Sequence, residues 1–219
     1  CAQRRIYPHW STIGGMFVIT QRKPFSYLQS VHTDCHGMAL LEFAILLPVL
    51  ILLLFGTIEI GRLAIIHQKV DKVADSMADF VTQADTICTP ELRSIAISAR
   101  QIMKPFTFNG SVIFSSVVHY DTGVPPCQGE NVSCISWQFK GFGPDASQIG
   151  SSGGNAAIPG GYEVHPGQNV IVSEVYYQYQ PMLPLSAELI PALAPQKLYK
   201  TAVYKPRKGT LSELCPPPR

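Results

Sequence analysis

A single glutamate, Glu42, stands near the start of a long apolar run. It is the only ionisable side chain between Met38 and Ile58. A carboxylate just inside the hydrocarbon of a membrane is costly, so we expect it to have a partner and a role. Gly37 lies five residues before Glu42. If a peptidase cuts after Gly37, the new α-amino group of Met38 is a cation at the start of a helix, and it could be that partner.

The expected pairing is between subunits. In a packed array, Glu42 of one subunit would meet the amino group of Met38 on the next, which neutralises both charges and sets the stagger between neighbours. The alternative is that Glu42 lies at the headgroup boundary and extends its carboxylate toward water. Prepilins share this pattern of a glycine, an apolar segment and a glutamate followed by an aromatic residue, here Phe43. We therefore predict prepilin peptidase cleavage between Gly37 and Met38.

The apolar run that holds Glu42 is long enough to cross a membrane. Residues 39–58 are almost all apolar, and a bilayer core needs about 20 helical residues. Pro48 lies within the run and predicts a kink near residues 44–48 rather than a break, because membrane helices tolerate proline. A cleaved secretory signal fits less well, since its apolar stretch is shorter and ends at a small-residue cleavage site. We predict a transmembrane helix at 38–62.

Charge on the two sides of the run predicts its orientation. Before the run, the basic residues Arg4, Arg5, Arg22 and Lys23 stand against the acidic residue Asp34. Charges of mixed sign follow the run. The positive-inside bias then places residues 1–37 in the cytoplasm as a leader, and residues 63–219 outside as an exported domain.

Two helices are expected next in the exported part. An apolar stripe at spacings of four and three continues the first helix to about Ala84. Its members are Ile66, Val70, Val73, Met77, Phe80 and Ala84. The stripe is either the face on which a sheet packs or a seam between subunits. A second helix should begin with Thr89 as N-cap, Pro90 at the first position and Glu91 in the first turn, and end before Pro105.

The pattern changes to strands after residue 110. Residues 111–120 are β-branched and aromatic, Ile135, Trp137 and Phe139 alternate with other residues, and further strands are expected at 169–180 and 198–205. The Gly-, Pro- and Ser-rich segment 141–168 is expected to be a flexible surface loop. The predicted fold class is therefore α+β: a long N-terminal transmembrane helix that continues into a domain with a short helix and a small antiparallel sheet.

Six cysteines divide by the predicted orientation. Cys1 and Cys35 lie on the cytoplasmic side, and the others lie outside, where disulfides persist. These are Cys88, Cys127, Cys134 and Cys215. Four cysteines allow three connectivities. The local choice joins Cys127 to Cys134, and Cys88 with Cys215 would then tie the C-terminal tail to the helices. A metal site fits less well, because Cys-x6-Cys is not a usual ligand spacing.

Other function classes find little support. The net charge is +2 and no basic stripe appears, so nucleic acid is not an expected partner. The sequence has no phosphate-binding loop, no nucleophile elbow and no His-Glu-x-x-His zinc motif. We therefore predict a protein that is not an enzyme and that uses no cofactor and no metal.

The segment GMALLEFAILLPVLILLLFGTIEIGRL resembles the start of the TadE family, which are minor pilin-like components of the tight-adherence (Flp) pilus system. Its close, with Glu59, Gly61 and Arg62, resembles the family's membrane-exit motif. The resemblance covers most of residues 37–207, with the loops excepted. Met38, Leu40 and Leu41 depart from the small residues usual between the glycine and the glutamate.

The resemblance implies a pilin-like pseudopilin that helps assemble a type IVb-like pilus for surface attachment and biofilm formation. Its partners would be other pilin-like subunits, the pilus assembly machinery and prepilin peptidase. It would lie in the bacterial inner membrane with its C-terminal domain in the periplasm. The alternative is a membrane-anchored periplasmic binding module or adhesin, in which Trp137, Phe142 and Tyr162 stack on a sugar near the 141–168 loop.

Overall fold

The computed structural model describes residues 35–120, 132–182, 188 and 190–215, and the chain divides into two compact units, Cys1–Phe55 and Gly56–Arg219. Helix α2, Cys35–Thr82, contributes to both units. Pro48 lies inside this helix without ending it, as the sequence predicts. In the first unit, the side chains from Met38 to Phe55 are exposed. Their helix is long and apolar enough to cross a membrane.

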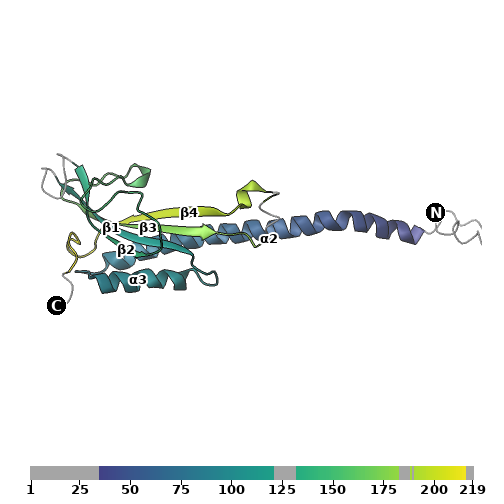
Figure 1. The fold of residues 1–219 in the computed structure, drawn as a ribbon, viewed down its shortest axis with the longest axis horizontal. Coiled ribbons are helices and arrows are strands. Elements are labelled where there is room, and N and C mark those ends of the chain that lie inside the picture. The colour runs from purple at the N-terminus through teal and green to yellow at the C-terminus, as the bar shows by residue number, and fades with distance from the viewer. Residues whose placement is uncertain (1–34, 121–131, 183–187, 189, 216–219) are drawn as a thin grey trace, which may run out of the picture. The chain divides into compact units, whose positions relative to one another are not determined.

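The second unit packs two helices on one sheet. Its elements are the rest of α2, α3 (Thr89–Ile102), β1 (Gly110–Tyr120), β2 (Val132–Phe142), β3 (Asn169–Tyr179), β4 (Gln196–Tyr204) and the short 3-10 turns η3 (Pro159–Gly161) and η4 (Pro191–Leu193). The strands are antiparallel in the order β2-β1-β3-β4. Helix α3 lies beside the C-terminal part of α2 (Figure 1). The predicted α+β, pilin-like arrangement is confirmed.

The stripe on α2 is the face on which the sheet packs. Its buried residues are Ile66, Val70, Val73, Ala74, Met77, Ala78 and Val81. Strands β3 and β4 supply partners such as Val175 and Leu198. The prediction is wrong for Phe80, which is 43% exposed. A spacing of alternating four and three averages 3.5 residues, and it drifts around a helix of 3.6 residues per turn. Ala78 and Val81 therefore take the place predicted for Phe80.

Helix α3 starts one residue earlier than predicted. Its N-cap is Cys88 rather than Thr89. The Glu91 carboxylate accepts a hydrogen bond from the Cys88 N–H at 3.0 Å, so the acid in the first turn satisfies an exposed backbone donor at the start of the helix, as in a capping box. At the other end, the Lys69 ammonium on α2 donates to the carbonyls of Ile102 and Lys104 at 3.3 and 2.7 Å. This cation closes the end of the helix, where carbonyls lack partners.

Strand β2 changes its inward face at a bulge. The register shifts between Ser116 and Val117 of β1, which pair with Trp137 and Ile135. Trp137 consequently belongs to the helix-facing core, whereas Ile135 belongs to a second cluster on the other face. Ile135 and Trp137 alternate in the sequence as residues on one strand face do, yet they lie on opposite faces, because a bulge inserts one unpaired residue and reverses the alternation.

The segment between β2 and β3 packs on the outer face of the sheet. Ile149 and Val164 are buried in the second cluster with Val117 and Val172. The Gln148 N–H donates to the buried Glu174 carboxylate at 2.8 Å, and the Ser147 hydroxyl also donates to it. Apolar burial and a buried acceptor therefore hold these residues of the predicted flexible loop 141–168 against the sheet.

Candidate functional site

Glu59 is the first charged residue after the apolar run, and it is buried in the second unit with 1% of its surface exposed. Its Oε1 accepts a hydrogen bond from the Tyr179 hydroxyl at 2.7 Å and from the Met182 N–H at 3.0 Å. The Arg62 guanidinium lies 3.4 Å from the same oxygen as an ion pair. Three donors thus converge on one carboxylate, which is what a buried charge requires.

Arg62 completes the connection between α2 and the end of β3. Its Nη1 donates to the Gln180 carbonyl at 3.0 Å. Its guanidinium carbon also lies 5.7 Å from the centre of the Phe106 ring and 5.9 Å from that of Tyr179, within the range of a cation–π interaction. Burial raises the pKa of Tyr179, and the hydrogen bond to the negative Glu59 raises it further. Tyr179 therefore stays a neutral donor.

This Glu59–Arg62–Tyr179 cluster satisfies its charges internally at the point where the apolar run ends. The sequence predicts Glu59 and Arg62 as a membrane-exit motif, but it gives no sign of Tyr179, whose partner lies 120 residues earlier. Gly61 is exposed, and a Cβ there would meet no atom within 4 Å. Packing within the second unit therefore does not require a glycine at this position.

The residues of the predicted cleavage and pairing site lie in the first unit. Gly37 is part of α2, and Met38 and Glu42 are exposed on the same helix. Met38 is 72% exposed. The Glu42 carboxylate is therefore accessible to groups outside the chain, as an intersubunit pairing requires.

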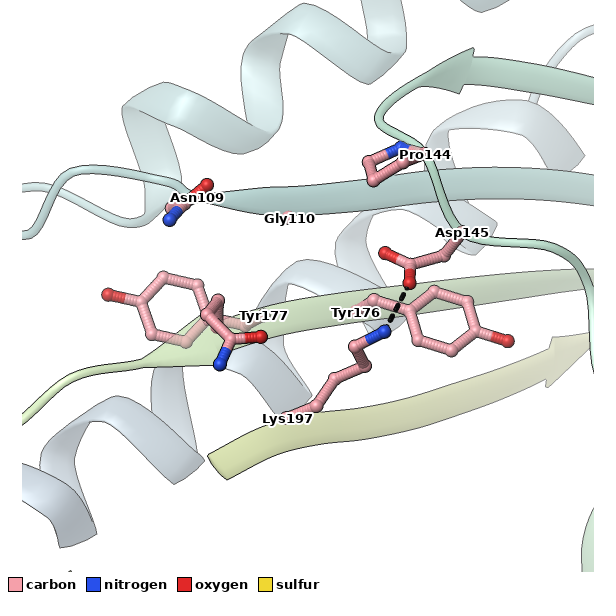
Figure 2. Close-up of a pocket in the computed structure, with 8 residues that line it drawn as sticks. Asn109, Gly110, Pro144, Asp145, Tyr176, Tyr177 and Lys197 are labelled. Carbon is pink, nitrogen blue, oxygen red and sulfur yellow. Dashed lines mark hydrogen bonds and ion pairs between the residues drawn. The ribbon is translucent and has the colours of Figure 1, made fainter. Parts of the chain in front are cut away.

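A small pocket opens on the second unit between the end of β3 and the loop after β2 (Figure 2). Its volume is about 180 Å³, below the roughly 300 Å³ at which ligand pockets usually begin. The Lys197 ammonium lies 2.6 Å from Asp145 in it. Partial burial opposes ionisation of Asp145, but hydrogen bonds from Lys197 and Ser111 lower its pKa. The pair fastens the loop to β4, and the pocket offers little room for a ligand.

The aromatic side chains of the alternative sugar-binding reading do not gather in one place. Trp137 is 6% exposed in the helix-facing core, and its Nε1–H donates to the Leu211 carbonyl at 2.7 Å. Phe142 packs edge-on to Phe108 with ring centres 5.4 Å apart. Tyr162 is exposed and follows η3 in the segment on the other face. Hydrophobic packing accounts for the first two.

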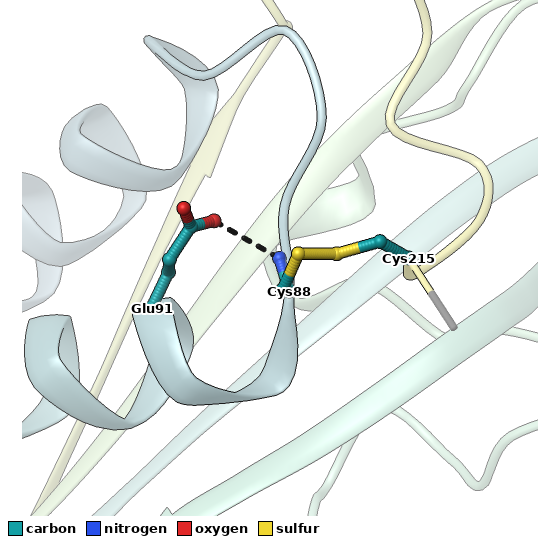
Figure 3. Close-up of a disulfide and its surroundings, with 3 residues drawn as sticks. All are labelled: Cys88, Glu91 and Cys215. Atoms are coloured by element: carbon teal, nitrogen blue, oxygen red, sulfur yellow. Dashed lines mark hydrogen bonds between the residues drawn. A yellow bond between two sulfur atoms is a disulfide. The ribbon is translucent and has the colours of Figure 1, made fainter. Parts of the chain in front are cut away.

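The Cys88–Cys215 disulfide ties the tail to the start of α3 (Figure 3). The sequence predicts this bridge for the case in which Cys127 joins Cys134. Next to it, the Cys215 N–H donates to the Ile87 carbonyl at 3.0 Å. Cys134 is buried in β2, whereas Cys127 lies outside the described residues, so that second pairing stays a prediction. Among the described residues, no three His, Cys, Asp or Glu side chains are grouped to hold a metal.

An apolar helix long enough to cross a membrane, a buried stripe beneath an antiparallel sheet and the Glu59–Arg62–Tyr179 cluster define a pilin-like α+β arrangement. Residues 37–79 are a TadE-like domain, matched by the family model described as TadE-like protein. The matched residues include Gly37, Glu42, Glu59 and Arg62, and the match ends within the buried stripe of α2. It is shorter than the resemblance over residues 37–207 seen in the sequence. It implies a Tad pilus-associated protein of a generally non-enzymatic family. No curated protein and no solved structure matches the chain significantly.

Proposed function

We propose that this chain is a TadE-type minor pilin, or pseudopilin, that takes part in assembling a tight-adherence (Flp) pilus used in surface attachment. The observation that carries the proposal is the division of α2 within the TadE-like domain. Its N-terminal part exposes apolar side chains and Glu42, whereas its C-terminal part is buried beneath the sheet. One helix thus offers a lipid- or helix-facing surface and carries a folded domain.

The proposed orientation follows the charge on the two sides of the anchor. Arg4, Arg5, Arg22 and Lys23 precede it, which favours a cytoplasmic N-terminus in the inner membrane and a periplasmic domain. The disulfide between Cys88 and Cys215 supports the same orientation, because disulfides persist in the periplasm and not in the cytosol.

The proposed chemistry of assembly is charge pairing between subunits. After prepilin peptidase cuts behind Gly37, the α-amino group of Met38 meets Glu42 of a neighbouring pilin-like subunit. Each group is costly alone in a medium of low dielectric constant, so the pair forms where the helices reach the correct stagger. Assembly then depends on a carboxylate at position 42.

The test is to replace Glu42 with Ala in the native host. We expect pili to be lost from the cell surface in electron micrographs, while the variant remains in the membrane fraction at normal abundance. Because Glu42 is exposed on α2, the exported domain should keep its fold. Glu42→Asp keeps the charge and is the matched variant, which should retain part of the piliation. Normal piliation with Glu42→Ala would contradict the proposed pairing.

A second test reads the mature N-terminus. Mass spectrometry of the membrane-purified protein should find a chain that begins at Met38, and the same protein from cells without prepilin peptidase should keep its leader. A leader retained in cells with a working peptidase would exclude the amino group that the pairing needs.

A further inference from the structure

The connection between β3 and β4 starts beside the Glu59–Arg62–Tyr179 cluster. Met182 donates its N–H to Glu59 at 3.0 Å, which holds this residue next to the first charge after the apolar run. Tyr179 pairs with Gln196 across the sheet, so both ends of the connection lie at the same end of the second unit. Two of its described side chains point outward: Met182 is 66% exposed and Ile190 is 36% exposed.

The composition of this connection is unusual for a loop in water. Apart from Ser186 and Glu188, every residue from 181 to 195 is Pro, Met, Leu, Ala or Ile. Met182 and Ile190 are its exposed large apolar side chains among the described residues, and apolar surface left in water indicates contact with a membrane or another protein.

We propose that Met182 and Ile190 contact the acyl-chain region of the membrane in which α2 is anchored. This inference rests on the membrane anchoring in the proposed function. Glu59 directly follows an apolar run of bilayer-spanning length, so on this proposal it lies at the boundary between the acyl chains and the headgroups. Met182, hydrogen-bonded to Glu59, lies at the same depth.

The cluster beside the connection favours lipid as the occupant. Glu59 accepts from Tyr179, Met182 and Arg62, and Arg62 also donates to Gln180. The charges of Glu59 and Arg62 are paired inside the unit, which lowers the cost of bringing them near a medium that offers no hydrogen bonds. The apolar side chains left outside gain by leaving water, as in proteins that lie on the membrane interface.

The test places a fluorescent reporter at the connection. Full-length Met182→Trp is reconstituted in vesicles of phosphatidylethanolamine and phosphatidylglycerol, with or without acyl-chain-brominated phosphatidylcholine. Bromine quenches tryptophan on contact, so the emission added by the new residue should be mostly lost in brominated vesicles. Tyr162→Trp, at an exposed position on the segment between β2 and β3, is the matched control and should lose little. The unsubstituted chain supplies the emission of its own two tryptophans for subtraction.

The outcomes separate this inference from the proposed function. Flotation of the protein with the vesicles, combined with equal quenching at positions 182 and 162, would overturn the lipid contact while leaving the anchor intact. Emission at 182 that is shielded from aqueous iodide but not quenched by brominated lipid would also overturn it, in favour of contact with another protein. A chain that does not float with the vesicles would overturn the anchoring and the lipid contact together.

Discussion

Glu59 shows how a charge at the end of an apolar run can be built into the fold. A carboxylate at the end of an apolar run could have stayed in water, yet its surface is almost fully buried. Tyr179 and Met182 approach it from the end of β3, and Arg62 approaches it from the next turn of α2. The chain thereby fixes its first turn outside the apolar run against the sheet.

Replacing Glu59 with Ala should destabilise the second unit. Tyr179, Met182 and Arg62 would lose their shared acceptor, and each buried polar group left without a partner costs about 1–3 kcal/mol. Thermal unfolding of the full chain in detergent, followed by near-ultraviolet circular dichroism, should show a lower midpoint. Glu42→Ala makes the same change at an exposed site on the same helix and should leave the midpoint unchanged. Equal midpoints for the two variants would contradict the structural role of Glu59.

Tyr199 should make the protein sensitive to alkaline pH. Burial raises the pKa of its hydroxyl, and the charge of the hydrogen-bonded Glu174 raises it further. A raised pKa means that the fold prefers the neutral phenol, so its contribution is complete below the unfolded value of about 10 and is lost as the pH rises above it. Tyr199→Phe should be less stable at pH 7 but lose stability less steeply above pH ~10. Parallel declines of the two proteins would exclude this coupling.

The residue scale also shows where sequence reasoning ends. Glu59 and Arg62 can be singled out because charges after an apolar run are conspicuous. Tyr179 cannot, since its contact depends on a strand pairing formed much later in the chain. The predicted N-cap of α3 is one residue too late, for a local reason. The Glu91 side chain accepts from the Cys88 N–H, so Cys88 is the N-cap and Thr89 is the first helical residue.

At the scale of elements, hydrophobic alternation predicted the strands closely. The predicted strand 169–180 is observed as Asn169–Tyr179, and 198–205 as Gln196–Tyr204. The bulges in β2 could not be predicted from the sequence, because a bulge depends on the partner strand as much as on its own residues. The packing of the segment after β2 on the sheet could not be predicted either, because few of its residues carry it. Ile149 and Val164 lie among glycines, prolines and serines.

Gly141 limits how close α3 can come to β2. A Cβ at this position would lie 2.5 Å from the Cβ of Ala96, which no packed pair tolerates. Gly141→Ala should therefore push the helix from the sheet and cost about 1–3 kcal/mol, the usual range for overpacking. The measurement is again the thermal midpoint of the full chain.

Ala96→Gly supplies the matched partner for Gly141→Ala. By itself it should cost about 1 kcal/mol, because glycine weakens a helix. In the double variant the added methyl group has room, so the combined loss should be smaller than the sum of the two single losses. Additive losses would show that the strain at Gly141 arises elsewhere.

At the scale of the whole molecule, the TadE-like match and the long apolar helix were predicted from the sequence, and the sheet order was not. Strand patterns give the strands but not their neighbours, and β1 pairs with β3 across a long segment. For the C-terminal tail, the sequence predicted only its attachment to the helices through Cys215. Its packing against the sheet, where the Leu211 carbonyl accepts from Trp137 and Ser116, has no local signature.

The disulfide should contribute strongly to stability because it closes a long loop. Cys88 and Cys215 are 127 residues apart, and loop-closure entropy sets an upper limit of about 5 kcal/mol for such a bridge. Cys215→Ser should lower the thermal midpoint, and a reductant should lower that of the unsubstituted chain by at least as much. An unchanged midpoint in Cys215→Ser would mean that the tail contacts alone hold this end.

The joint between Glu59 and the end of β3 has a mechanical consequence. Tyr179 is the last residue of a central strand that is hydrogen-bonded to neighbours on both sides. If the chain is anchored as proposed, tension along α2 would enter the sheet at Tyr179 and spread to both flanking strands as shear. The second unit would then resist unravelling from the end at which Glu59 lies.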